Sequence, residues 1–159
     1  MSATLTSLMG LLALTATPTS IDTASFQFGD SVEQHADYFS SHCMNTTLRE
    51  LDPAELPLAT TSHVQIDCEG FAYFGAERMA EFVFADGALT HIWILVNAGE
   101  LAALQTDFEA GFGTPDHETD SFVAFNDHNA AIRRDIPEAL YYGDAAAPLF
   151  HAWFAQSAG

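Results

Sequence analysis

The feature that most constrains the fold is the stretch 78–96, where two runs of β-prone residues flank Asp86 and Gly87. An Asp-Gly pair accommodates the positive φ angles of a two-residue hairpin turn. Because side chains alternate along a strand, pairing Ala85 with Ala88 places an apolar set on one face. The pattern therefore predicts a central β-hairpin whose buried face carries Phe82, Phe84, Leu89, Trp93 and Leu95.

The sequence before this hairpin predicts a helix and a further strand. Residues 30–43 carry apolar side chains at helical spacing, and Asp30 with Glu33 forms a capping-box sequence at their start. Residues 44–61 are polar, hold two prolines and indicate a surface connection. Residues 63–74 alternate between apolar and polar, which predicts a half-buried strand that stops at Gly75.

The sequence after the hairpin repeats this order. Asn97 and Glu100 start a predicted helix that ends near Gly113 and Pro115. Three short strands are predicted over 121–125, 130–136 and 139–142, and a last helix over 144–154. The fold class is therefore α+β, an antiparallel sheet with helices packed on one face. Two tandem halves of one helix and three strands, 25–96 and 97–159, form one domain over 25–159.

The charge balance excludes some partners. The chain has 22 acidic residues, four arginines and no lysine, which gives a formal net charge of −18. Such a surface repels nucleic acid and anionic lipid. Solubility, adaptation to salt and attraction of a cationic partner all remain explanations of this acidity.

The N-terminal segment and the two cysteines bear on compartment. Residues 1–24 contain an apolar run of signal-peptide length that is too short to cross a bilayer, but no arginine or lysine precedes Arg49. Cys43 and Cys68 either form one disulfide, worth roughly 3 kcal/mol, or remain as buried thiols. We expect a periplasmic or secreted protein without a transmembrane span. The alternative is a cytoplasmic protein of a salt-adapted organism.

Two short motifs suggest a family resemblance. Phe26-Gln27-Phe28-Gly29-Asp30 leads into a predicted helix, and Phe112-Gly113-Thr114-Pro115 leads out of one. In this the chain resembles small envelope modules, the outer-membrane assembly lipoproteins and the β-lactamase-inhibitor protein. The resemblance implies helices packed on one face of an antiparallel sheet, and a function in binding other proteins. The chain lacks the cysteine that follows the apolar leader in the lipoproteins.

Clustered acids and histidines are the first candidates for chemistry, but they fit no catalytic or metal-binding motif. The cluster lacks the spacing of a zinc or calcium site, so we interpret it as a solvated acidic face and expect neither a metal nor a cofactor. Arg133 and Arg134 are interpreted as structural partners of carboxylates. The candidate metal-binding cluster comprises Asp116, His117, Glu118, Asp120, Asp127 and His128.

Aromatic side chains are the best candidates for recognition. Neighbouring residues of a strand point to opposite faces, so some of these rings must meet the last helix or be exposed to a partner. His91 is expected to lie opposite Phe82 and beside Trp93, without a carboxylate to orient its ring. The candidate contact residues are Phe71, Tyr73, Phe74, His91, Trp93, Tyr141 and Tyr142.

These observations favour a non-enzymatic, exported domain that binds another envelope or extracellular protein. The alternative is a small-ligand-binding or hydrolytic domain with a pocket between helices and sheet, lined by aromatic residues and His91. The two hypotheses differ in what they require. The first needs a broad exposed sheet face, and the second needs an enclosed cavity that reaches His91.

Overall fold

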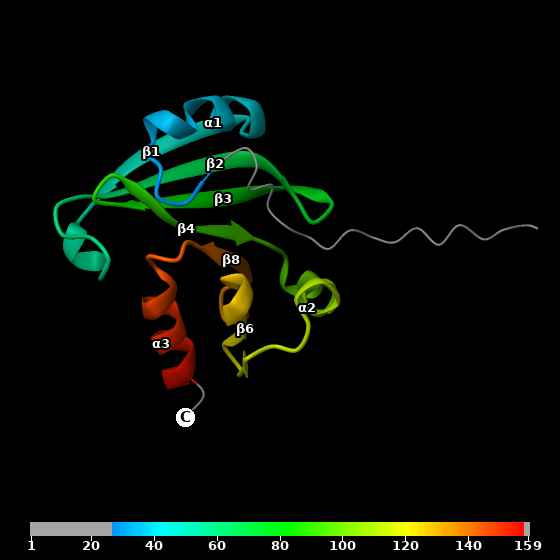
Figure 1. Ribbon diagram of the computed structural model, residues 1–159. Helices are drawn as coiled ribbons and strands as arrows, with labels where there is room; N and C mark the ends of the chain where they lie inside the picture. The colour runs from blue at the N-terminus through cyan, green and yellow to red at the C-terminus, as the bar shows by residue number, and fades with distance from the viewer. Residues whose placement is uncertain (1–26, 158–159) are drawn as a thin grey trace, which may run out of the picture.

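A computed structural model describes residues 27–157 and shows one eight-stranded antiparallel sheet with three α-helices (Figure 1). The predicted α+β class is confirmed. The strand order across the sheet is β1-β2-β3-β4-β8-β7-β6-β5. The strands are β1 (Asn45–Leu51), β2 (His63–Tyr73), β3 (Ala76–Ala85), β4 (Ala88–Leu95), β5 (His117–Glu118), β6 (Phe122–Phe125), β7 (Ala130–Arg133) and β8 (Glu138–Tyr142). The α-helices are α1 (Ala36–His42), α2 (Leu101–Phe112) and α3 (Ala147–Ser157).

The sheet consists of two four-stranded meanders that join where β4 pairs with β8. Each meander follows one helix, α1 before β1–β4 and α2 before β5–β8. The two-part order predicted from the sequence is present, with four strands in each half instead of three. The additional strands, β1 and β5, form the two edges of the sheet.

Strand β1 corrects the prediction of a surface connection over 44–61. Residues 45–50 are all exposed, so the strand shows no alternation of buried and exposed side chains. The prolines occur only after it, and Pro53 begins the 3₁₀ turn η2 (Pro53–Glu55). An edge strand that neither face buries carries no periodic signal, which explains why the sequence pattern missed it.

The helices divide between the two faces of the sheet. Helices α1 and α2 cover one face of the sheet, the face that carries Phe82, Ile92 and Ile132. The prediction of helices packed on one face describes these two helices. Helix α3 lies on the opposite face (Figure 1). There Phe150 and Phe154 pack on side chains of β6 and β8. The sheet therefore has a core on each side, and the second core is built mainly by the second half.

The central hairpin forms around Asp86 and Gly87, and Ala85 pairs with Ala88 as predicted. The register then shifts by one residue, because Thr90 is an extra residue in β4 between the pairs Phe84–Leu89 and Val83–His91. After this β-bulge the side chains of β4 still alternate, but each one points to the face opposite to that predicted by unbroken alternation from Leu89.

The bulge overturns part of the predicted hairpin face. Phe82, Phe84 and Leu89 belong to the core under α1 and α2. Trp93 instead packs against two apolar clusters on the opposite face of the sheet, one around Phe150 and one around Val83. Leu95 is exposed. The expected pairing of His91 with Phe82 is also wrong, since Phe82 pairs with Ile92.

The helix starts were predicted with different success. Asn97 and Glu100 form the expected capping box before α2, and Gly113 ends that helix with φ +87°. In the first helix Ser31 and Gln34 exchange the reciprocal capping bonds instead of Asp30 and Glu33. The carbonyl of Asp30 accepts a hydrogen bond from the Leu89 amide, which keeps it outside the helix.

Cys43 and Cys68 form a disulfide that joins the end of α1 to the middle of β2, as one of the two sequence-based alternatives proposed. The predicted strand over 63–74 is β2. The predicted N-terminal segment 1–24 lies outside the described residues. Within residues 27–157, no helix is long and apolar enough to cross a membrane.

Candidate functional site

Four of the candidate contact residues lie away from the α3 face of the sheet. Phe71, Tyr73 and Tyr141 are buried beneath α1 and α2, and the Tyr73 and Tyr141 hydroxyls are 2.8 Å apart. Phe74 sits in the β2–β3 turn with φ +47° and is partly buried against the same core. Burial raises the pKa of Tyr141 well above its usual range, so its hydroxyl remains protonated. These side chains hold the core together.

The other three candidates, His91, Trp93 and Tyr142, lie on the α3 face. Tyr142 is buried against Phe150 and accepts or donates a 3.1 Å hydrogen bond with His151 Nε2. His91 and Trp93 line a groove of about 440 Å³ between β4, α3 and the segment 55–57. We call this the α3 groove. Its lining comprises Glu55, Leu56, Pro57, His91, Trp93, Leu149, Phe150, Ala152, Trp153 and Gln156.

Local structure fixes the His91 ring at the base of this groove. The Thr90 hydroxyl lies 3.0 Å from the Val83 carbonyl and 2.9 Å from His91 Nδ1. The ring also meets Phe150 edge-on, with centroids 5.1 Å apart. Only 4% of His91 is exposed, and burial lowers its pKa to about 3. His91 is therefore a neutral, firmly held imidazole at neutral pH.

A second groove, which the sequence patterns did not predict, lies on the other face between α1 and β1. This α1–β1 groove has a volume of about 640 Å³. At its border Met44 is 65% exposed and Leu48 is 54% exposed. Its lining comprises Val32, Glu33, Ala36, Phe39, Ser40, Cys43, Met44, Asn45, Thr46, Leu48 and Ile66. The sequence signal for it is limited to Met44 and Leu48, two large apolar residues in the otherwise polar stretch 44–50.

The outer edge of β1 adjoins this groove. Strand β1 pairs with β2 on one side, and no other described strand pairs with it. It is seven residues long, whereas β5 at the opposite edge has two. The backbone groups along the outer side of β1 thus form the longest open edge of the described sheet.

Exposed carboxylates surround the β1 edge. Glu33 lines the α1–β1 groove, and Asp37 is exposed on α1. Glu50 and Glu69 are exposed on β1 and β2. The one arginine of β1, Arg49, lies 3.5 Å from Asp67. The edge therefore combines an apolar groove with an acidic border.

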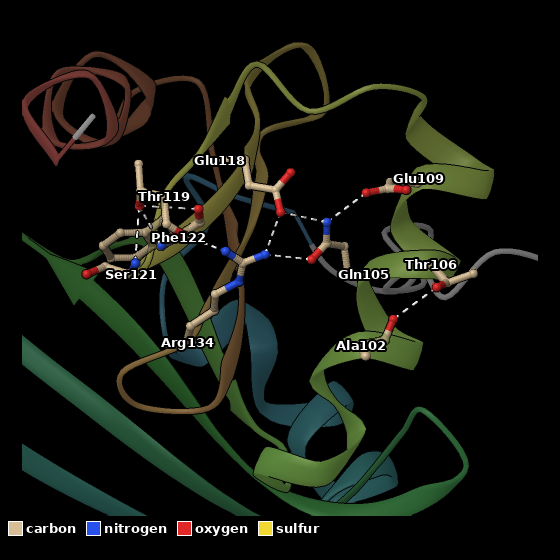
Figure 2. Close-up of polar contacts among 9 residues, drawn as sticks. All are labelled: Ala102, Gln105, Thr106, Glu109, Glu118, Thr119, Ser121, Phe122 and Arg134. Carbon is tan, nitrogen blue, oxygen red and sulfur yellow. Dashed lines mark hydrogen bonds and ion pairs between the residues drawn. The ribbon is translucent and has the colours of Figure 1, made fainter. Parts of the chain in front are cut away.

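The acids of the predicted cluster around β5 are all exposed, in agreement with the interpretation as a solvated acidic face, and two of them also make contacts within the fold. Asp116 accepts a 2.7 Å hydrogen bond from the Asn126 amide. Glu118 accepts hydrogen bonds from Arg134 and from Gln105 of α2 (Figure 2). Among the described residues, no group of three or more histidine, cysteine or carboxylate side chains is placed to hold a metal ion.

Arg134 connects three elements, as the structural interpretation of the arginine pair predicted. Its guanidinium donates to the Thr119 carbonyl, to Gln105 Oε1 at 2.8 Å and to Glu118 Oε1 at 2.7 Å (Figure 2). Gln105 in turn donates to Glu109 one turn along α2. This network fastens the β5–β6 region to α2. Arg133 pairs with Asp135 on the other face.

A buried acid lies near Arg133. Glu138 is 7% exposed, and its Oε2 is 3.6 Å from Arg133 Nη1, too far for a hydrogen bond. Burial raises the pKa of Glu138 to about 7, and the attraction of Arg133 only partly offsets this effect. Burial therefore disfavours the ionised form of Glu138.

Comparison with known proteins finds no match to a family model, to a curated protein or to a solved structure. The functional inference therefore depends on the geometry of the two grooves.

Proposed function

We propose that this protein is a non-enzymatic binding domain that adds an extended segment of another protein to the outer edge of β1. The observation that carries the proposal is the open edge of β1 beside the α1–β1 groove. An extended segment that pairs with a sheet edge gains main-chain hydrogen bonds, and its alternate side chains gain specificity from adjacent pockets.

The groove is placed to receive those alternate side chains. A bound strand would point every second residue toward the face that carries α1. There it meets the partly buried Cys43 and Val32 and the exposed side chains of Met44 and Leu48. Burying such large apolar side chains contributes about 1.5–3 kcal/mol each. The edge supplies affinity, and the groove selects apolar side chains at alternate positions.

The acidic border determines the chemistry of the remaining positions. Glu33, Asp37, Glu50 and Glu69 are exposed around the edge, and the net charge of the chain is −18. Complementary potentials speed association and reject partners of the same sign. The preferred partner segment is therefore an extended one in which apolar and basic residues alternate.

The same proposal places the domain outside the reducing cytoplasm, in the periplasm or secreted. The Cys43–Cys68 disulfide supports this location, because such bonds persist in oxidising compartments. The resemblance to small envelope modules agrees with it, since those modules work in the envelope. Intact-mass measurement of protein from its native host, with free thiols alkylated, tests it. Alkylation of both cysteines would contradict export.

Fluorescence anisotropy with a labelled nine-residue peptide of alternating valine and lysine tests the binding mode. We expect this peptide to bind more tightly than a peptide of the same composition with its valines and lysines in two blocks. Leu48→Asp should weaken binding at least tenfold, because it places a charge where the peptide side chains are buried.

Ile136→Asp is the matched control. Ile136 is 45% exposed in the turn between β7 and β8, far along the sheet from β1, so this variant adds the same charge elsewhere. It should bind the alternating peptide like the unmodified protein. Equal binding of the two peptides, or equal loss in the two variants, would show nonspecific attraction to an acidic surface and overturn the proposal.

A further inference from the structure

The α3 groove is separate from the β1 edge and contains a polar atom that the described protein does not use. We propose that it is a second binding site, for a small uncharged aromatic alcohol. The hydroxyl group of this ligand donates a hydrogen bond to His91 Nε2, and its ring packs against Trp93 and Trp153. This site goes beyond the proposed protein-binding function and does not depend on it.

The hydrogen bonds of Thr90 determine which nitrogen of His91 is free. The Thr90 hydroxyl donates its single proton to the Val83 carbonyl at 3.0 Å. Its oxygen can then only accept from His91, so the proton of the imidazole is on Nδ1, 2.9 Å away. Nε2 consequently carries a lone pair. It can accept a hydrogen bond but not donate one.

None of the residues 27–157 supplies that hydrogen bond. His91 is 96% buried and lines the groove, yet no donor of the described chain lies within bonding distance of Nε2. Nε2 is not among the fully buried polar atoms that lack a partner, so it opens onto the groove, where a ligand that brings a donor gains a hydrogen bond in apolar surroundings. The low pKa of His91, about 3, keeps the imidazole in this accepting form.

Aromatic rings shape the space above this nitrogen. Trp93 lies edge-on to His91, with centroids 6.1 Å apart, and edge-on to Trp153 at 6.5 Å. Phe150 also lines the groove, with its ring centroid 6.2 Å from that of Trp153. The volume of about 440 Å³ falls in the range of small-molecule sites, about 300–1,000 Å³. A flat apolar ring therefore fits the groove in both size and surface.

Charges around the groove select against ions. The Arg133 guanidinium lies 5.8 Å from the Trp93 ring and 6.0 Å from the Trp153 ring, so a cation on these rings would meet a positive charge. Glu55 lines the groove, and the net charge of −18 opposes an anion. An uncharged ligand with one hydroxyl group meets neither penalty.

Two matched probes test the site: 4-propylphenol, and its methyl ether 4-propylanisole, which cannot donate. The chain contains only two tryptophans, and both line the groove, so their indole N–H signals in an NMR spectrum report on it directly. We expect 4-propylphenol to shift both signals and to bind about fivefold more tightly than the ether, the effect of one neutral hydrogen bond.

Variants separate the hydrogen bond from the rings. His91→Phe should reduce the preference for the phenol to about onefold, whereas His42→Phe, at an exposed position of α1, should keep it. Trp153→Ser, which removes a ring that is 37% exposed, should weaken both probes and serves if His91→Phe does not fold. Equal binding of the two probes, a preference that survives His91→Phe, or unshifted indole signals would overturn the proposal.

Discussion

Replacing Glu138 by glutamine should make the protein more stable at alkaline pH. The carboxyl group is 7% exposed and has one oxygen without a hydrogen bond. Burial raises its pKa from 4.5 to about 7 in the folded protein. Between these pH values the folded state keeps a proton that the unfolded chain releases. The free energy of unfolding therefore falls as the pH rises through this window.

The size of the effect follows from the same two values. At about 1.4 kcal/mol for each pH unit, ionising Glu138 costs about 3 kcal/mol once the pH exceeds 7. Glutamine has the same shape and no charge, so Glu138→Gln removes this cost. We expect its advantage over the unmodified protein to be about 2–3 kcal/mol larger at pH 8 than at pH 5.

Urea unfolding at both pH values measures this difference. The matched control is Glu77→Gln, which neutralises an exposed acid on β3 and should show no comparable change between pH 5 and pH 8. A Glu138→Gln variant that gains nothing at pH 8, or that gains equally at both pH values, would refute a buried, weakly compensated carboxyl group at this position.

Three further perturbations test the supports of the fold. Replacing Cys43 and Cys68 by serine should lower the free energy of unfolding by about 3 kcal/mol, and reduction of the unmodified protein should match it in urea. Asp86→Asn should lower the urea midpoint at pH 7, because this carboxylate accepts bonds from the amides of residues 60–62, which hold its pKa far below 3.8. The stabilisation that the ionised Asp86 carboxylate contributes is present above pH 3.8 and is lost as the pH falls below it. The difference in urea midpoint between the variant and the unmodified protein should therefore shrink in acid. Arg134→Lys should cost about 1 kcal/mol and speed hydrogen exchange in β5, whereas unchanged exchange would contradict its role in fastening that strand.

Local sequence signals predicted the parts of the fold that local chemistry controls. The Asp86-Gly87 turn, the alternation along β2 and the Asn97–Glu100 capping box each depend on neighbouring residues, and each is present. The disulfide could be proposed because a helix end and a strand were both predicted at the right positions.

The parts that were missed depend on contacts between distant residues. The bulge at Thr90 is stabilised by a hydrogen bond to Val83 across the hairpin, and it reverses the direction of every later β4 side chain. The alternation of apolar residues alone therefore placed Trp93 on the wrong face. Strand β1 was missed because exposure on both faces removes the pattern that identifies strands.

The candidate site was predictable only in part. His91 and Trp93 were named from the sequence, but their groove is completed by α3 and the segment 55–57. The α1–β1 groove joins residues from a helix, a turn and an edge strand, none of which suggests recognition alone. Sites of this kind become visible only when the elements are placed together.

Hydrogen exchange along β1 tests the central claim most directly. The protein would be measured alone and when saturated with the alternating valine–lysine peptide. Strand addition predicts that the added protection is concentrated in residues 45–51, because their outward backbone groups gain partners. Protection spread evenly over the acidic surface, or confined to the region of α3, would contradict binding at the β1 edge.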